Sequence, residues 1–384
     1  MKLAFQLAYR NLVGAGLRTW LNVIVLSFAY VMIIFYNGIL DGWNRQARTD
    51  TIAWEYGEGQ LRNEAYDPYD PFTILDGHSI LPKEQREGLV PVLLRQGTIY
   101  PDGRMLSAMV KGIDAHQEIL NIPTQRLLAS AAAIPVVIGK RMAESANLNE
   151  GDDVLMRWRD ANGTYDAANI TVEAIFDCNV PTVDNGQIWM DINKLWELTQ
   201  LNQSATYFVN TKNVVVEGEG WAYISQGELL ADLDEMIAMK KVSSSVMYGL
   251  LLAIALLAIF DTQVLSIFRR QREIGTYISL GMTRTKVVTL FTFEGTMYSI
   301  LASVIGNLYG IPLFVYMSKV GMGMPEANQN MGVAVAERIF PVYSAGLILG
   351  TVLVVIISAT IVSFLPARKI AKMNPVDALK GKLQ

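Results

Sequence analysis

Few side chains in this sequence could carry out catalysis or bind a metal ion. The histidines are His78 and His116, and the single cysteine is Cys178. His78 and Ser79 with scattered aspartates would make a hydrolytic triad on paper, but no glycine-framed nucleophile turn surrounds any serine. One cysteine cannot form an intramolecular disulfide, and two histidines leave too few soft ligands for a zinc or iron site. We therefore expect no catalytic and no metal-binding residues, and we interpret both histidines as surface or loop residues.

Phosphate-binding motifs are also missing from the sequence. A nucleotide-binding loop of the type G-x-x-x-x-G-K-[ST] cradles phosphates with glycine backbone and a lysine. The nearest stretches, Gly139 to Arg141 and Gly275 to Gly281, lack the second glycine or the lysine and hydroxyl pair. We expect this chain to bind neither ATP nor another cofactor.

The composition indicates a chain that is partly soluble and partly embedded in a membrane. Of the 384 residues 51% are hydrophobic, and the mean hydropathy of +0.26 is high for a soluble protein. Four apolar runs are long enough to span a bilayer as helices: residues 21–40, 242–268, 287–317 and 342–365, the last closed by Pro366. No small-residue cleavage site follows the first run, so we expect it to stay uncleaved.

The distribution of charged residues predicts the orientation of these spans in the membrane. Residues 1–20, 269–286 and 366–384 together hold 13 basic and two acidic residues, so the positive-inside rule places them and both termini in the cytoplasm. Residues 41–241 hold 17 basic and 30 acidic residues and form the extracytoplasmic domain, with residues 318–341 as a second outer loop. The net charge of the whole chain is only −4, which argues against nucleic acid as a partner.

The fold class that follows is a membrane domain of four helices plus a large mixed α/β domain between the first and second helices. Runs with the length and residue bias of strands are residues 90–95, 106–110, 136–138, 154–159, 170–176 and 187–190. Helical patterns cover residues 141–146 and 193–199, the second with Asp191 or Asn193 as N-cap. Residues 226–241 also have helical spacing, and we expect this helix to continue into the second span as a stalk.

Two amphipathic segments flank the spans on the basic side. Residues 1–20 place Leu3, Leu7, Ala8 and Leu12 at helical spacing, which indicates either a helix lying along the membrane face or a plain extension of the span. Residues 269–286 predict a short helix with Ile274, Ile278 and Tyr277 on one face. In that segment Gly281 suits the position after the helix, and Thr283 can cap the next one. Resting on anionic lipid head groups is one role for such a helix.

The second segment resembles the signature of the ABC transporter permease superfamily that includes MacB, FtsX and the lipoprotein-releasing permeases LolC and LolE. Further stretches that resemble this family are residues 7–12, 17–21 and 366–379. In the outer domain, four stretches are most similar to the lipoprotein-releasing branch: residues 59–61, 110–114, 137–140 and 151–154. The resemblance covers almost the whole chain. It implies a bacterial inner-membrane protein with a two-lobed periplasmic domain.

The resemblance also implies partners. Residues 269–286 would be a coupling helix that docks on a separate ATPase, with ATP and magnesium bound by that ATPase. The residues that would transmit its closure are Arg272, Glu273, Ile274, Gly275, Leu280 and Gly281. The complex would hold two ATPases and a second permease, either a copy or a paralogue, in contact with membrane lipids and with a periplasmic lipoprotein carrier or another periplasmic protein as a further partner.

Two acidic residues in the spans need an explanation because a charge in a bilayer is costly. Asp261 stands where relatives usually have asparagine, and it either has a function or pairs with Arg269 or Lys286, the reading we favour. Glu294 resembles a family glutamate and equally suits a structural cap for neighbouring helix ends.

Gly306 and Gly310 form a G-x-x-x-G match, which permits close helix packing but also arises by chance in membrane spans.

The function that these observations favour is that of a permease subunit that extracts or releases lipoproteins or another amphiphile at the outer face of the inner membrane, driven by ATP hydrolysis on its partner. The alternative is an FtsX-like actuator that regulates a periplasmic enzyme without transporting anything. A receptor that works without an ATPase would leave residues 269–286 unexplained.

Overall fold

The computed structural model describes residues 17–210, 219–323 and 338–372. It divides into a helical unit, Met1–Gly42, Ile237–Met322 and Phe340–Gln384, and an α/β unit, Trp43–Met236 and Gly323–Ile339. The predicted amphipathic helix around residues 3–12 and the end of the tail at residues 373–384 lie outside the described residues.

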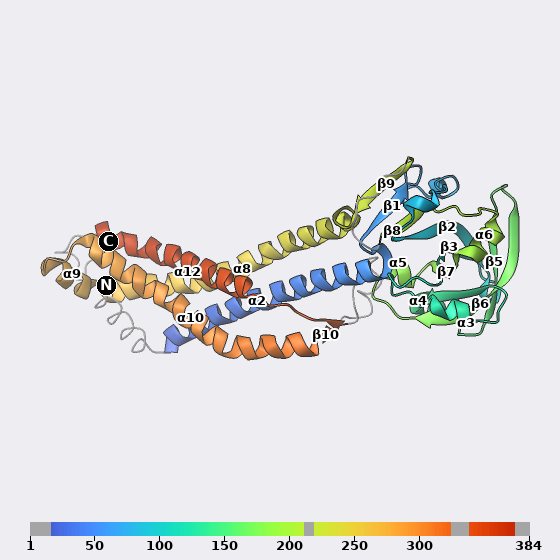
Figure 1. Cartoon of the computed structure of the whole chain (residues 1–384). Coiled ribbons are helices and arrows are strands. Elements are labelled where there is room, and N and C mark those ends of the chain that lie inside the picture. Colours follow the sequence, from blue (N-terminus) through green and yellow to red (C-terminus); the bar gives the residue numbers. More distant parts are fainter. Residues whose placement is uncertain (1–16, 211–218, 324–337, 373–384) are drawn as a thin grey trace. The chain divides into compact units, whose positions relative to one another are not determined.

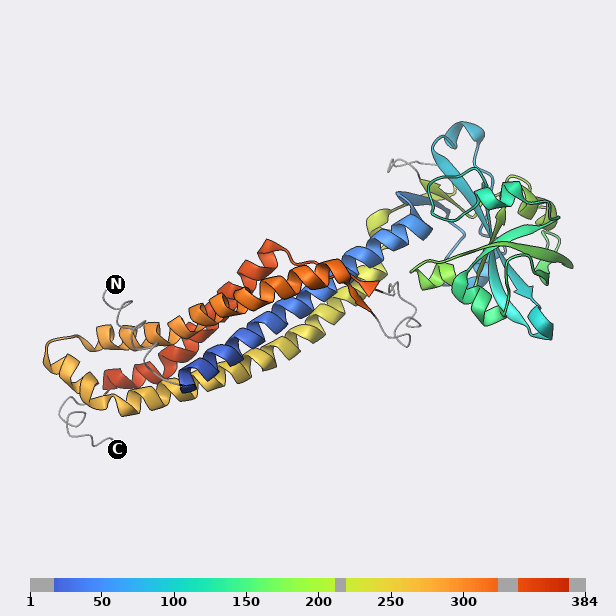
Figure 2. The same cartoon turned by 90° about the horizontal axis from the view of Figure 1, so that it is seen from below.

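Three of the predicted spans lie within one long helix each, and the fourth, predicted for residues 342–365, is helical from Ala345 onward. These helices are α2 (Leu17–Thr51), α8 (Ala231–Arg269), α10 (Arg284–Val320) and α12 (Ala345–Ala367). All four are long and apolar enough to cross a membrane. They lie side by side in Figures 1 and 2, and the short helix α9 (Gln271–Ser279) connects α8 to α10.

Small residues allow α10 to approach α2 closely. A Cβ atom on Gly306 would lie 2.6 Å from Cδ1 of Tyr30, and one on Gly310 would lie 3.0 Å from Cγ2 of Val31. Tyr30 is fully buried, and its hydroxyl donates a hydrogen bond to Oδ1 of Asn307 at 2.9 Å. The structure thus places both glycines of the G-x-x-x-G match at the contact between α10 and α2.

The α/β unit is built on a nine-stranded mixed sheet in the order β3-β7-β4-β6-β5-β2-β8-β1-β9. The strands are β1 (Gly59–Asn63), β2 (Leu89–Ile99), β3 (Leu106–Ile113), β4 (Pro135–Gly139), β5 (Asp153–Arg159), β6 (Tyr165–Phe176), β7 (Gln187–Asp191), β8 (Tyr207–Asn210) and β9 (Trp221–Ser225). The β3–β7 and β4–β6 pairs are parallel and the other pairs are antiparallel. Because β2 also pairs with β3, six strands close into a ring.

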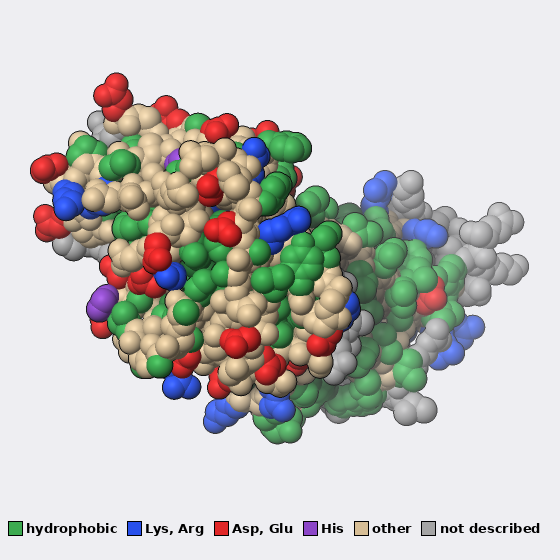
Figure 3. All heavy atoms as spheres, turned by 90° about the vertical axis from the view of Figure 1, so that its right-hand side faces the viewer, with side chains coloured by type: hydrophobic (Ala, Val, Ile, Leu, Met, Phe, Trp, Pro, Cys, Tyr) green, Lys and Arg blue, Asp and Glu red, His purple; other side chains and the backbone are tan. Residues whose placement is uncertain are grey.

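Two hydrophobic cores form on this sheet. The larger core lies in the ring and includes Val110, Val136 and Ile188. The smaller core, which includes Leu61, Phe208 and Trp221, belongs to the β2-β8-β1-β9 part of the sheet. The outer surface is rich in acidic side chains, which are spread over the face that Figure 3 presents.

Helices and single turns connect the strands. They are α3 (Gln125–Ala129), α4 (Lys140–Ala146), α5 (Pro181–Asp184), α6 (Ile192–Thr199), α7 (Gln226–Leu229), the π-helix η1 (Ile52–Tyr56) and the 3₁₀ turns η2 (Pro71–Ile74), η3 (Lys83–Gln85), η4 (Pro101–Gly103) and η5 (Arg368–Lys372). Two short strands, β10 (Met322–Gly323) and β11 (Arg338–Ile339), lie between α10 and α12 in the chain.

Most predicted elements of the α/β unit are present. All six predicted strands exist, and Asp191 caps α6 by accepting hydrogen bonds from the backbone of Asn193 and Lys194. The predicted helix that continues into the second span is present as α8, but it starts at Ala231 and not at residue 226, because the chain leaves helical geometry at Leu230, between α7 and α8. A capping box between Ser225 and Glu228 starts α7 separately.

A buried ion pair holds α5 against the N-terminus of α4. Asp184 is only 1% exposed, its carboxylate lies 3.2 Å from Nε of Arg141, and it also accepts a hydrogen bond from the Arg141 backbone. Burial raises the pKa of Asp184 from 3.8 to about 6, against the opposing effect of the hydrogen bond and the charge of Arg141. Folding therefore favours the protonated acid between these two values.

This pKa shift predicts a pH dependence of stability. The folded chain binds more protons than the unfolded chain between about pH 4 and pH 6, so Asp184 should lower stability as the pH rises, by at most about 1.4 kcal/mol per pH unit. Relative to the neutral variant Asp184→Asn, the wild type should lose thermal stability across this range, as measured by circular dichroism of the purified chain. A difference between the two proteins that stays constant from pH 4 to pH 7 would contradict the assignment.

Candidate functional site

The α9 helix is held by its own apolar face. Ile274 is fully buried, and Tyr277 and Ile278 pack beside it. The apolar cluster that this face belongs to, called the α9 cluster below, combines Ile274 of α9 with residues from the end of α8, the start of α10, the end of α12 and η5: Ile267, Val287, Val288, Phe291, Ala367 and Ile370. Any displacement of α9 must therefore disturb three long helices.

Arg270, the residue before α9, connects α9 to α10 by charge. Its Nε atom lies 2.7 Å from Oε2 of Glu273, in the first turn of α9. Its Nη1 atom lies 2.9 Å and 3.1 Å from the two carboxylate oxygens of Glu294 in α10. The guanidinium also lies over the ring of Phe291, 4.9 Å from its centroid.

The electrostatics of this site favour the charged form of Arg270. Burial acts to lower the pKa of Arg270, but the carboxylates of Glu294 and Glu273 outweigh it and raise that pKa. The side chains of Arg270 and Glu294 are only 18% and 8% exposed, so each depends on the other for compensation.

The six predicted coupling residues divide into two groups. Four of them are exposed: Arg272, Glu273, Leu280 and Gly281. Leu280 is 80% exposed, which is unusual for a leucine directly beside an apolar cluster. Ile274 and Gly275 are buried and face the bundle, so they support the helix from behind.

The turn after α9 has the geometry that the sequence indicates. Gly281 follows the C-cap residue Leu280 and has a φ of +93°, a conformation that favours glycine. Thr283 occupies the N-cap position of α10, but its side chain makes no capping hydrogen bond.

The ion pair predicted for Asp261 is absent. Asp261 is exposed on α8, and among residues 17–210, 219–323 and 338–372 no salt bridge joins it to Arg269 or Lys286. Arg269 lies eight residues further along the same helix, a rise of about 12 Å, which is too far for direct pairing. Asp261 therefore faces outward without the compensation that Glu294 receives.

Arg270 is the residue that sequence reasoning missed. Arg269 was the arginine expected to pair with an acid in the spans, but the break between α8 and α9 turns the next residue, Arg270, toward α10. The available signal was that a buried glutamate in a span requires a cation near the membrane edge. Three arginines in residues 269–272 made the choice ambiguous.

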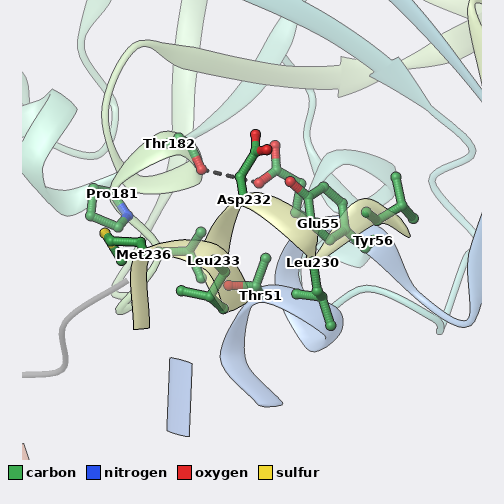
Figure 4. Close-up of a pocket in the computed structure, with 11 residues that line it drawn as sticks. Thr51, Glu55, Tyr56, Pro181, Thr182, Leu230, Asp232, Leu233 and Met236 are labelled. Carbon is green, nitrogen blue, oxygen red and sulfur yellow. Dashed lines mark hydrogen bonds between the residues drawn. The ribbon is translucent and has the colours of Figure 1, made fainter. Parts of the chain in front are cut away.

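A cavity of about 260 Å³ lies in the α/β unit (Figure 4). Its apolar wall comes from Val180, Pro181, Leu229, Leu230, Leu233 and Met236, and its polar groups are Thr51, Glu55, Tyr56, Thr182 and Asp232. Sequence reasoning missed this site, since its residues come from the end of α2, η1, α5, α7 and the start of α8.

The two carboxylates of the cavity have different partners. Glu55 lies 3.6 Å from Nζ of Lys111 and accepts a hydrogen bond of 3.0 Å from the Thr182 hydroxyl. Asp232 accepts a hydrogen bond from the hydroxyl of Tyr69.

Comparison with known proteins gives a family for the helical part of the chain. Residues 245–375, which contain α9 and the α9 cluster, match the family described as FtsX-like permease C-terminal. The ABC transporter permease YknZ of Bacillus subtilis (strain 168) is 25% identical over 199 residues, 52% of this chain and 46% of that protein.

Two further relatives have the same character. The pyoverdine export ATP-binding/permease protein PvdT of Pseudomonas syringae pv. syringae is 30% identical over 142 residues, 36% of this chain and 19% of that protein. An ABC transporter permease of Methanocaldococcus jannaschii is 25% identical over 131 residues, 34% of this chain and 30% of that protein. The aligned segments thus span less than half of the length of each of these relatives.

The Arg270–Glu294 pair predicts a non-additive effect on stability. Arg270→Gln should leave the buried Glu294 uncompensated and cost about 3 kcal/mol of unfolding free energy. The double variant Arg270→Gln/Glu294→Gln should recover most of that loss, because no buried charge remains. Arg272→Gln, an exposed arginine two residues away, serves as the control and should change little. Equal losses in the single and double variants, measured by thermal unfolding in lipid nanodiscs, would rule out the pair.

Proposed function

Because the chain is a member of the ABC transporter permease superfamily that includes FtsX, MacB and LolC, we propose that it works with a separate ATPase. ATP hydrolysis by that ATPase would drive the release of lipoproteins or another amphiphile. The basic segments around α9 would face the cytoplasm of a bacterial inner membrane, and the acidic α/β unit the periplasm. ATP and magnesium would be bound by the ATPase.

The construction of α9 is the observation that carries this proposal. The helix presents Arg272, Glu273 and Leu280 outward while its other face is anchored in three long helices. A partner that grips the exposed face could therefore move the bundle, and Arg270 would carry part of that force directly to α10 through Glu294. An isolated loop resting on lipid would not need the ion pair between Arg270 and Glu294.

A second permease, a copy or a paralogue, is supported by the outer face of α8. Exposed apolar residues recur at helical spacing along it: Met239, Val242, Val246, Leu250, Ile254, Leu257, Leu265 and Phe268. Asp261 continues the same stripe. A carboxylate facing lipid is costly, so we infer that this stripe packs on the second permease and that Asp261 lies in the contact.

Transport is favoured over control of a periplasmic enzyme by one relative's name. PvdT is named as an export protein that combines ATP-binding and permease parts. In the mechanism we propose, closure of two ATPases draws two permeases together, and α2 and α8 carry this motion to the α/β units, which hand on the substrate to a periplasmic carrier or another periplasmic protein.

The coupling proposal predicts a separation of folding from activity. Leu280→Asp should abolish stimulation of ATP hydrolysis by the permease and release of a labelled lipoprotein from liposomes, since a charge replaces an exposed apolar contact. Membrane insertion and thermal stability should be unchanged, because Leu280 is 80% exposed. Leu280→Met is the matched control and should retain both activities.

Two results would redirect this interpretation. Full coupled activity in Leu280→Asp would remove α9 as the docking helix. Activation of a cell-wall hydrolase by ATP without release of lipoprotein would favour the actuator function.

The α8 contact predicts a specific cross-link. In a Cys178→Ser background, Leu257→Cys should form a disulfide-linked dimer in membranes under mild oxidation, if two copies of this chain pair. Leu349→Cys, an equally exposed leucine on α12, should not. Cross-linking to a co-expressed paralogue would identify a heterodimer, whereas equal yields at both positions or none at either would contradict an α8 contact.

A further inference from the structure

We propose that the cavity in the α/β unit is a binding site for a primary ammonium group carried on a short aliphatic chain. The inference rests on the lining of the cavity alone and holds whether or not the chain acts in lipoprotein release. The residues that line the cavity lie outside residues 245–375, the segment that matches the FtsX-like permease C-terminal family.

The apolar part of the cavity suits an aliphatic chain. Leu229 and Leu230 are buried, and Leu233 and Met236 follow on the first turns of α8. Val180 and Pro181 belong to the α5 segment that Asp184 and Arg141 hold in place. Concave sites with mainly apolar walls and a few convergent polar groups are the usual form of small-ligand sites.

The charges of the cavity leave one carboxylate, that of the exposed residue Asp232, open to a cation. Glu55 and Lys111 compensate each other, with side chains that are 16% and 6% exposed. Asp232 is bound only by the neutral hydroxyl of Tyr69, and within the described part of the chain no cation pairs with it. Asp232 is exposed, so its carboxylate offers a negative charge beside the apolar wall that a cationic ligand can reach from solvent.

A comparison within the first turn of α8 shows that this arrangement is particular to Asp232. Asp234, two residues later, pairs with Arg48 of α2 through both carboxylate oxygens. Both acids lie at a helix N-terminus, which stabilises negative charge in general. Only Asp232 lines the cavity, where it lies on the same side of the view as Glu55 in Figure 4.

The polar groups also favour a donor of several hydrogen bonds. Asp232 Oδ1, the Thr51 hydroxyl and the Tyr56 hydroxyl belong to residues that line the cavity, and all three can accept. A primary ammonium offers three donors, and charge-assisted hydrogen bonds are the stronger kind. The π-helical turn η1, which carries Glu55 and Tyr56, adds support because such turns are frequent at functional sites.

The experiment compares three ligands of equal chain length that differ in charge. The full chain in phosphatidylcholine nanodiscs is titrated with hexylammonium, hexanol or hexanoate, and hydrogen–deuterium exchange is followed in peptides that cover residues 49–58 and 226–236. We expect hexylammonium to protect both peptides, hexanol to protect them at about tenfold or more higher concentration, and hexanoate to have no effect.

Variants assign the effect to the cavity. Asp232→Asn should raise the half-saturating hexylammonium concentration about tenfold, whereas Glu235→Gln, which removes the same charge from an equally exposed residue of α8 that does not line the cavity, should leave it unchanged. Leu233→Trp should block binding by filling the cavity. Exchange in the β5–β6 hairpin verifies that each variant is folded.

The outcomes separate the source of the ammonium and test the proposal itself. Protection in nanodiscs of phosphatidylethanolamine without added amine would identify a lipid headgroup as the source, and protection by hexylammonium alone would identify a soluble amine; both support the site. Equal protection by hexylammonium and hexanol, or an unchanged titration in Asp232→Asn, would overturn it.

Discussion

A carboxylate buried among apolar helices must be neutralised, and in this protein that requirement organises the end of the helical unit. Glu294 lies inside α10, and Arg270 reaches it from the break in the chain between α8 and α9. The break creates α9, and the apolar face of α9 then closes over the ends of α8, α10 and α12. The position of the short helix is thus a consequence of charge compensation as much as of apolar packing.

The second acid of the apolar helices meets the same cost in another way. Asp261 is on the outer face of α8, where no side chain of the described residues compensates it. The charge of Glu294 is compensated within the same chain, whereas the charge of Asp261 must be compensated by a neighbouring molecule or by solvent. The two acids of the apolar helices therefore differ in where their charge is compensated: inside the bundle for Glu294 and outside it for Asp261.

The sequence predicted the features that depend on local pattern. Apolar run length predicted four long helices, alternation predicted six strands, and the turn chemistry around Gly281 predicted the end of α9. It did not predict β1, β8 or β9, because these are short strands whose burial comes from pairing across the sheet with residues far away in sequence. Arg270 was missed for a similar reason: its partner Glu294 is 24 residues away, and only the turn of the chain selects it among three arginines. The cavity depends on three separate stretches of the chain, residues 51–56, 180–182 and 229–236, which no local pattern connects.

The long strand β2 has a mechanical consequence for the α/β unit. Its first residues, Leu89–Val92, pair with β8 in the smaller core, and its last, Gly97–Ile99, pair with β5 in the larger one, while β3 follows it from Val92 onward. A force applied to either core would be transmitted to the other through the continuous backbone of β2, and not through a flexible linker. The two cores should accordingly unfold in a single cooperative step. A force applied at one end of the domain should move both cores together, because β2 provides no hinge between them.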